Sequence, residues 1–210
     1  MRQNKRFLKR SRLYLVLDTQ VQPYDKLLKV LKKAVCAGVD IIQLRDKEGC
    51  VKDILKFTQQ ALKYVDNRCL FIVNDRVDFA LAAGAHGVHL GQDDLPVATV
   101  RKMVGSKMII GASCQTLAHA RKAQAEGADY IGFGSVFKTL TKPERAPMKL
   151  KLLSRVVKEV QIPVFAIGGI NTINAIRLKD LGVDRIAVTR VISLADNVER
   201  TVKEFNEILM

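Results

Sequence analysis

The sequence predicts a single α/β domain folded as a closed (β/α)8 barrel, the TIM barrel, on three observations. Eight short apolar runs alternate with longer segments that have helical spacing, and most of the runs end in a group of polar or charged residues. A glycine turn also recurs just before an apolar run, at Gly38, Gly84, Gly127 and Gly182. Each interval between these turns has room for two βα units of roughly 20 to 30 residues, so four turns imply eight strands.

The apolar runs are read as strands because a strand covered on both faces must be apolar along its length. The predicted strands are Leu13–Leu17, Ile41–Leu44, Leu70–Val73, Gly87–Leu90, Met108–Ile110, Tyr130–Phe133, Val164–Ile167 and Arg185–Val188. Reactive groups then occur only where a strand leaves the core. In a parallel barrel those points share one end, which is where the active site of such enzymes lies.

Helical spacing predicts the segments between the strands. Pro23 suits the first turn of a helix to Ala37, whose inner face carries leucines, and Lys52–Val65 repeats that spacing. A short helix is expected around 77–83, and Pro96 opens the next, which ends at 104. Thr116 is an expected N-cap of a helix to 126. The last three helices are expected at about 149–160, 172–181 and 194–209, and the longest connection is 134–147.

Length and charge separate a basic N-terminal extension, residues 1–12, from a barrel domain at 13–210. The chain has 210 residues, 48% of them hydrophobic, and a net charge of +14. Met1–Arg12 contains no acid and six cations, Arg2, Lys5, Arg6, Lys9, Arg10 and Arg12. A basic arm can bind nucleic acid or anionic lipid. No nucleic-acid motif accompanies it, so we expect a solvated, partly frayed extension and no nucleic-acid partner.

The cysteines and histidines give no sign of a metal or disulfide framework. The four cysteines lack any C-x-x-C pair, which favours free thiols in a reducing, cytoplasmic setting. His86 and His89 would face opposite sides of a strand, which disfavours a metal pair. No apolar run reaches the roughly 20 residues of a membrane span. The oligomeric state stays open, a homo-oligomer included.

The polar groups after the strands favour chemistry on a diphosphate. Asp75 and Asp94 follow the third and fourth strands, and Mg2+ is commonly held by one or two carboxylates together with substrate phosphates. Surface acids, or an N-cap in the case of Asp75, are the simpler alternative. The cations Arg45, Lys47 and Lys142 suit the charge of a diphosphate, and the amides of Gln43 and Asn74 can contact a heteroaromatic ring edge. Gly168-Gly169, after the seventh strand, stands where barrels often bind a phosphate.

These motifs together resemble the thiamine-phosphate synthase (thiamine-phosphate pyrophosphorylase) family. The resemblance runs in order from about Leu13 to the last helix. It is carried by five segments, 43–47 (Gln-Leu-Arg-Asp-Lys), 74–76 (Asn-Asp-Arg), 91–94 (Gly-Gln-Asp-Asp), 137–142 (Phe-Lys-Thr-Leu-Thr-Lys) and 168–170 (Gly-Gly-Ile). It implies condensation of hydroxymethylpyrimidine diphosphate with thiazole phosphate, giving thiamine phosphate and pyrophosphate.

The resemblance also implies roles for individual residues. Those implied to contact the pyrimidine diphosphate are Gln43, Leu44, Arg45, Asp46, Lys47, Asn74, Ser113 and Lys142. Those implied to hold the thiazole phosphate are Thr139, Leu140, Thr141, Gly169, Val191 and Ile192. Mg2+ would be ligated by Asp75 and Asp94. Catalytic roles fall to Arg45, Lys47, Ser113 and Lys142, in a dissociative substitution that needs no general base, so the lack of an obvious catalytic His or Cys fits.

Some positions depart from the family pattern, and two rivals stay open. Ile192 stands where the family usually has Ser, and Ser135 and Lys138 stand where proline is common. One rival is a paralogue resembling the thiazole tautomerase, an isomerase that needs a proton-transfer residue and no Mg2+ diphosphate clamp. Having Asp75, Asp94 and Lys142 together argues against it. The other rival is a barrel that binds a phosphorylated ligand without catalysis.

Overall fold

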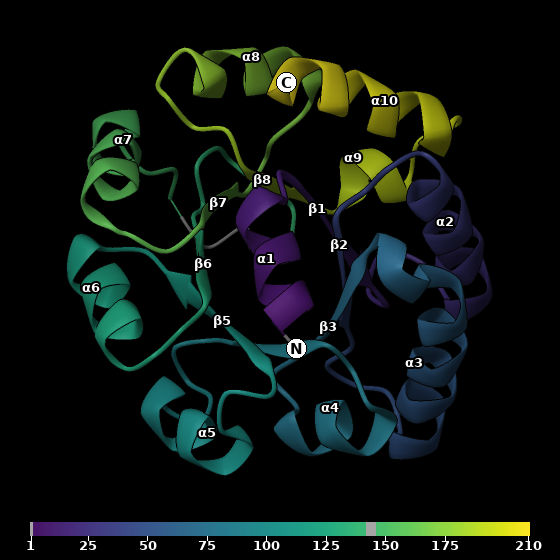
Figure 1. Cartoon of the computed structure of the whole chain (residues 1–210). Helices are drawn as coiled ribbons and strands as arrows, with labels where there is room; N and C mark the ends of the chain where they lie inside the picture. The colour runs from purple at the N-terminus through teal and green to yellow at the C-terminus, as the bar shows by residue number, and fades with distance from the viewer. Residues whose placement is uncertain (1, 142–145) are drawn as a thin grey trace.

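A closed barrel of eight parallel strands forms the centre of the computed structural model, which describes residues 2–141 and 146–210 (Figure 1). The strands are β1 Leu13–Asp18, β2 Ile41–Arg45, β3 Leu70–Asn74, β4 Gly87–Leu90, β5 Ile109–Cys114, β6 Tyr130–Phe133, β7 Val164–Ile167 and β8 Ile186–Val188. They pair in chain order, and β1 pairs with β8 from Leu13 opposite Ile186 to Leu15 opposite Val188. The predicted (β/α)8 fold is therefore confirmed.

Helices surround the barrel and follow the predicted order (Figure 1). They are α2 Tyr24–Cys36, α3 Val51–Val65, α4 Val77–Ala83, α5 Val97–Val104, α6 Leu117–Ala125, α7 Leu150–Glu159, α8 Thr172–Lys179, α9 Arg190–Ser193 and α10 Val198–Leu209, with a 3-10 turn at Asp66–Arg68. Thr116 caps α6, as predicted, by accepting a hydrogen bond from the His119 backbone N–H. The four predicted glycine turns all have positive φ, between 71° at Gly84 and 94° at Gly38 and Gly127, a conformation that costs other residues a Cβ clash.

Two apolar layers hold the barrel together. Side chains that point outward from the strands pack against the inner faces of the helices, for example Leu13 and Leu15 with Leu27 and Leu31 of α2. Side chains that point inward form a separate cluster, which consists of Leu8, Tyr14, Val16, Ile41, Leu70, Ile72, Ile109, Tyr130, Phe165 and Ala187. The barrel interior is thus filled, as is usual for an eight-stranded barrel.

The N-terminal segment is a helix, and the prediction of a frayed extension was wrong. Helix α1, Arg2–Arg10, lies across the centre of the barrel (Figure 1). Leu8 is only 2% exposed because it packs on the inner cluster of the barrel, with Phe7 beside it. Lys5 also forms an ion pair with Asp129, which has a side-chain N···O distance of 2.7 Å. The basic composition hid the two apolar residues that dock the helix.

Two other boundaries differ from the prediction, one at the end of the fifth strand and one after the eighth. The fifth strand extends to Cys114, so Ser113 lies on a strand and not after it. The segment after β8 forms α9 before the final helix, which begins at Val198 instead of 194. Among the residues that the structure describes, no helix is both long enough and apolar enough to cross a bilayer.

Candidate active site

A cavity of about 370 Å³ opens at the C-terminal ends of the strands. Its lining includes residues at the ends of several strands and residues just after those ends, as the apolar runs with polar ends predict. The polar residues of its lining are Tyr14, Asp18, Gln43, Arg45, Asn74, His89, Ser113, Tyr130, Ser135, Lys138, Thr139, Thr141, Asn171, Thr189 and Arg190. Many of the residues predicted for the site therefore do converge at one end of the barrel.

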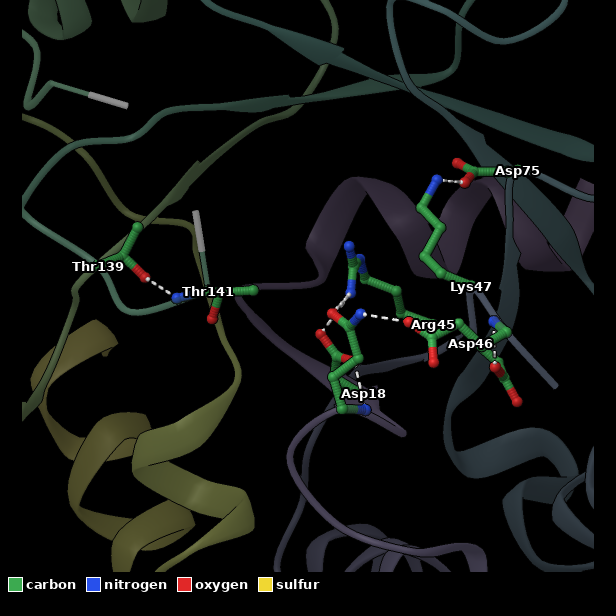
Figure 2. A network of polar contacts seen from close by, with 9 residues as sticks. Asp18, Arg45, Asp46, Lys47, Asp75, Thr139 and Thr141 are labelled. Atoms are coloured by element: carbon green, nitrogen blue, oxygen red, sulfur yellow. Dashed lines mark hydrogen bonds and ion pairs between the residues drawn. The ribbon is translucent and has the colours of Figure 1, made fainter. Parts of the chain in front are cut away.

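Two acids and a lysine gather at the mouth, and we call Lys47, Asp75 and Asp94 the rim cluster. The Lys47 ammonium forms an ion pair with the Asp75 carboxylate (Figure 2). Asp75 has φ of 60°, in the left-handed region, and it does not cap α4, whose N-cap is Arg76. Left-handed non-glycine residues are uncommon and are worth examining as functional positions.

The two carboxyl groups of the rim cluster touch one another. Burial, then a hydrogen bond with Asp75 and that residue's charge, raise the pKa of Asp94 above its ordinary value. The Gly91 backbone N–H donates to Asp94 Oδ2 at 2.6 Å and acts in the opposite direction. Two acids held this close favour either a shared proton or a cation between them.

Arg45 is anchored by a buried acid that sequence reasoning missed. Arg45 Nη1 donates to Asp18 Oδ2 at 2.7 Å and to Gln20 Oε1 at 3.1 Å (Figure 2). Asp18 is 1% exposed, and its other oxygen accepts from the Gln20 backbone N–H at 3.0 Å. Asp18 is the last residue of β1, so the rule that found Asp75 and Asp94 could have found it too.

Two residues of the 43–47 segment point away from the cavity. Leu44 belongs to the layer between strands and helices. Asp46 accepts hydrogen bonds from the Tyr24 hydroxyl and from the backbone N–H groups of Glu48 and Gly49. Although burial raises the pKa of Asp46, these hydrogen bonds outweigh it and lower the pKa overall. The structure therefore gives Asp46 a role in bracing this loop and does not bring its side chain to the cavity.

A chain of polar side chains crosses the bottom of the cavity. Gln43 Nε2 donates to the Tyr14 hydroxyl at 2.7 Å, and the hydroxyls of Tyr14 and Tyr130 are 2.8 Å apart. His89 joins Tyr130 to Ser113, with 3.0 Å on each side of its ring. Both phenols have a raised pKa, chiefly because they are buried. We call these five residues the cavity floor.

The cavity floor contains a histidine and two tyrosines that the sequence analysis did not place at the site. His89, Tyr14 and Tyr130 were not predicted there, because their place depends on which strand residues face inward. The strand register determines these inward-facing positions, because Asn74 pairs with His89 and Gly111 pairs with Tyr130. His86 has a different partner, because its Nδ1 accepts from the Phe71 backbone N–H at 2.9 Å.

The opposite side of the cavity is formed by backbone and hydroxyl groups. Thr139 and Thr141 line it, and the Thr141 backbone N–H donates to Thr139 Oγ1 at 3.3 Å (Figure 2). Gly168 and Gly169 also line it, with φ of 107° and 64°. A Cβ at Gly169 would lie 2.3 Å from the Lys138 carbonyl oxygen. The neighbouring loop therefore leaves no room for a side chain at position 169.

The residues predicted beyond β8 are only partly at the cavity. Val191 lines it, whereas Ile192 is 0% exposed and packs in the core. Thr189 and Arg190 line the cavity instead, and so does the exposed cation Lys138. Leu140 lines it as well, with most of its surface exposed. Lys142, expected to contact the diphosphate, lies outside the described residues.

The donor set at the mouth suits an oxygen-loving cation better than zinc. Within residues 2–141 and 146–210, no group of three or more His, Cys, Asp or Glu side chains could enclose a metal. The rim cluster offers two carboxylates, the number with which Mg2+ is often held when phosphates and water supply the remaining oxygens. The described cysteines are free, and none of them joins this cluster.

The fold and the cavity define a class, the (β/α)8-barrel enzymes whose site lies at the C-terminal mouth of the barrel. The particular family follows from comparison with known proteins. Residues 13–192 match the model of the family described as thiamine monophosphate synthase. The chain belongs to this family. The match confirms the family and the activity, synthesis of thiamine phosphate, that the motifs predict.

Individual relatives agree with this assignment. A protein named thiamine-phosphate synthase from Ruminiclostridium cellulolyticum is 39% identical over 199 residues, which are 94% of this chain and 95% of the relative. One of the same name from Prochlorococcus marinus subsp. pastoris is 44% identical over 182 residues, or 86% of this chain but only 51% of the relative. The solved structure of the thiamine phosphate pyrophosphorylase from Pyrococcus furiosus has a TM-score of 0.87 and 34% identity, covering 98% of this chain and 97% of that one.

Proposed function

We propose that this enzyme joins hydroxymethylpyrimidine diphosphate to thiazole phosphate, releasing pyrophosphate. The observation that carries the proposal is the rim cluster, two touching carboxyl groups and a lysine, which lies beside Arg45 and Asn74 of the cavity lining without lining the cavity itself. Such a group of charges suits a diphosphate bound together with a divalent cation. The amide and hydroxyl groups of the cavity floor suit a polar ring.

The residues at the mouth fit Mg2+. Asp75 and Asp94 are close enough to hydrogen-bond to each other, and Lys47 balances only one negative charge. A cation between the two acids would remove their repulsion and displace the proton that they now favour. When bound there, Mg2+ would supply positive charge to the diphosphate oxygens.

The chain's own residues would carry the rest of a dissociative substitution. Gln43 would orient the pyrimidine so that its amino group donates electrons to the exocyclic methylene carbon while the carbon–oxygen bond breaks. Arg45, held by Asp18, and Lys47 would stabilise the charge gathering on the departing diphosphate. The thiazole nitrogen then forms the new carbon–nitrogen bond. That nitrogen carries a lone pair and no proton, so no base is needed.

The thiazole phosphate would occupy the opposite side of the cavity. Thr139, Thr141 and Gly169 line that side, and the exposed cations Lys138 and Arg190 stand near its edge. Backbone N–H groups and hydroxyls in such a position bind phosphate oxygens well. Val191 lines the same side, while the buried Ile192 side chain is not proposed to touch the ligand.

Turnover of the two substrates with Mg2+ tests this proposal. Formation of thiamine phosphate, matched by an equal amount of pyrophosphate, is the expected result. Isomerisation of a thiazole phosphate without Mg2+ would favour the tautomerase-like rival. Binding of either ligand with no product would favour the non-catalytic barrel.

We further infer that the enzyme works in the cytoplasm. The four cysteines are unpaired, as suits a reducing compartment. Fractionation of cells that produce the full chain, followed by immunoblotting, tests the compartment. Sedimentation of the purified protein tests the homo-oligomer that the sequence left open.

A further inference from the structure

We propose that Tyr14, Tyr130 and His89 form a one-way hydrogen-bond relay from Gln43 to Ser113, which gives the two ends of the cavity floor opposite hydrogen-bonding character. The Gln43 end accepts a hydrogen bond from the ligand, and the Ser113 end donates one. The part of this inference that concerns the pyrimidine rests on the proposed function. The direction of the relay itself does not.

The relay is continuous and enclosed. Its four hydrogen bonds measure 2.7 Å, 2.8 Å, 3.0 Å and 3.0 Å, in order from Gln43 to Ser113. Gln43 is 4% exposed, and both tyrosines are buried. Buried polar groups in such a network must nearly all find partners, because an unpaired one costs about 1 to 3 kcal/mol.

Two glycines make room for the relay. A Cβ at Gly111 would lie 2.1 Å from the Tyr130 ring, and a Cβ at Gly132 would lie 3.3 Å from the His89 ring. A glycine inside a strand weakens the strand and often marks the close approach of another group. Phe165 closes the other side, with its ring edge-on to both tyrosine rings. The rings are therefore held in place by their packing.

The direction of the relay follows from counting protons. An amide nitrogen can only donate, so Tyr14 accepts from Gln43 Nε2 and uses its single proton toward Tyr130. Tyr130 then donates to His89 Nδ1, which leaves the proton of the neutral ring on Nε2, directed to Ser113 Oγ. A reversal at either tyrosine would leave the proton of Tyr14 or of Tyr130 buried without an acceptor.

The consequence appears at the two ends. Ser113 Oγ accepts from His89, so its own proton is available to an acceptor in the cavity that Ser113 lines. The amide nitrogen of Gln43 donates to Tyr14. Its amide oxygen can therefore accept a hydrogen bond from the ligand, and no described residue donates to that oxygen. The floor therefore selects a ring that presents an amino group at Gln43 and a lone pair at Ser113. His89, engaged on both nitrogens, serves as a positioning residue and not as a base.

The tautomer of His89 tests the direction without any substrate. The full chain, labelled with 15N in its three histidines, is examined by long-range 1H–15N NMR, and His89→Gln identifies the His89 signals. The expected result is a neutral ring with its proton on Nε2. Tyr130→Phe, which removes one hydroxyl and keeps the ring, should weaken this preference. A proton on Nδ1 in the unaltered protein, alone or together with one on Nε2, would overturn the proposal.

Ligand discrimination tests the consequence. By titration calorimetry with Mg2+, the unaltered chain should bind the amino-pyrimidine diphosphate at least about ten-fold more tightly than its oxo analogue, since two facing oxygens leave one unpaired. Tyr14→Phe releases the Gln43 amide and should narrow that ratio. Tyr64→Phe, which alters a partly exposed phenol on α3, should leave it unchanged. Equal affinity for both ligands in the unaltered chain would refute the assignment at Gln43.

These experiments separate the relay from the proposed function. If the unaltered chain makes no thiamine phosphate but His89 carries its proton on Nε2, the proposed function fails and the relay stands. If the chain is active and Tyr130→Phe raises the KM for the pyrimidine substrate alone, by about ten-fold with kcat retained, the relay acts by uniform binding, as we infer. Equal effects on both substrates would count against it.

Discussion

At the scale of single residues, the site depends on charges that the barrel holds close together. Asp75 and Asp94 follow neighbouring strands, and burial together with their contact raises the pKa of Asp94. Asp18 pairs with a charge of opposite sign. Its buried carboxylate lies 2.7 Å from Arg45 Nη1 and fixes the guanidinium in one orientation. A charge-assisted pair of this kind provides geometry as well as attraction.

Asp94→Ala should remove most turnover and leave the fold intact. The variant removes one of the two carboxylates proposed to hold Mg2+, so the leaving diphosphate would lose its counter-charge, and a fall in kcat of about 10² or more is expected. Asp93→Ala is the matched control, since this exposed neighbour lies outside the rim cluster. Steady-state kinetics over a Mg2+ series measure both. Full activity of Asp94→Ala with excess EDTA would remove the metal role.

His86 should make the protein less stable in mild acid. Burial lowers the pKa of His86 below its ordinary value of 6.5. The unfolded chain therefore binds one more proton as the pH falls below about 6.5, and the free energy of unfolding decreases until the folded form is protonated too. Above that window this group contributes no pH dependence. Urea unfolding of the unaltered chain and His86→Asn across the window should show a flatter slope for the variant; identical slopes would contradict the prediction.

Sequence reasoning found the residues that end strands and missed those that need neighbours. Asp75, Asp94 and Arg45 follow from apolar runs with polar ends. The cavity floor does not, because His89 and Tyr130 enter it through strand register, which a single sequence does not reveal. The family resemblance placed Ile192 at the cavity, yet α9 turns its side chain into the core.

At the scale of elements, loops that touch each other shape the phosphate side. The segment after β6 and the turn after β7 pack closely, with the Phe137 backbone N–H donating to the Gly168 carbonyl at 2.9 Å. Asn171 caps α8 reciprocally with Asn174, whose side chain also donates to the Gly169 carbonyl at 2.9 Å. These contacts set the course of the Gly168-Gly169 backbone. Sequence periodicity predicted the helices and strands, but it cannot predict such contacts between loops.

Gly169→Ala should weaken thiazole phosphate binding and lower stability together. Its Cβ would meet the Lys138 carbonyl and displace the segment that carries Thr139 and Thr141. Gly84→Ala is the control, because Gly84 also has positive φ while its Cβ would meet nothing within 4 Å. Both variants bear the backbone strain of a left-handed residue that has a Cβ, about 1 to 2 kcal/mol. Any further loss in Gly169→Ala, measured by urea unfolding and the KM for each substrate, reports the clash; equal losses would refute it.

At the scale of the whole molecule, the barrel has one working end and one closed end. The cavity lies at the C-terminal mouth, and α1 covers the other end with Leu8 and Phe7. The alternation of apolar runs predicted the barrel. Helix α1 could not be predicted in the same way, because two apolar residues among many cations carry little periodic signal.

Leu8→Ala should destabilise the protein without altering its chemistry. The side chain is almost fully buried, and removing it from the closed end should cost about 2 to 5 kcal/mol. Lys9→Ala changes the exposed neighbour on the same helix and should cost little. Thermal unfolding measures both, and the KM values at a low temperature should match those of the unaltered chain. An unchanged melting temperature for Leu8→Ala would mean that α1 does not seal the barrel in solution.

The closed end also gathers both termini of the polypeptide. Helix α1 starts there, and the Arg12 guanidinium donates to the carbonyl of Leu209, next to the last residue, with both ends visible in Figure 1. A tether or an appended domain at either terminus would therefore be attached at the face opposite the mouth. It would not block the entry or exit of ligands. The geometry is compatible with the Prochlorococcus relative, in which a matching stretch makes up only 51% of the protein. Immobilising the protein through a tag at either terminus should therefore leave the cavity accessible to ligands.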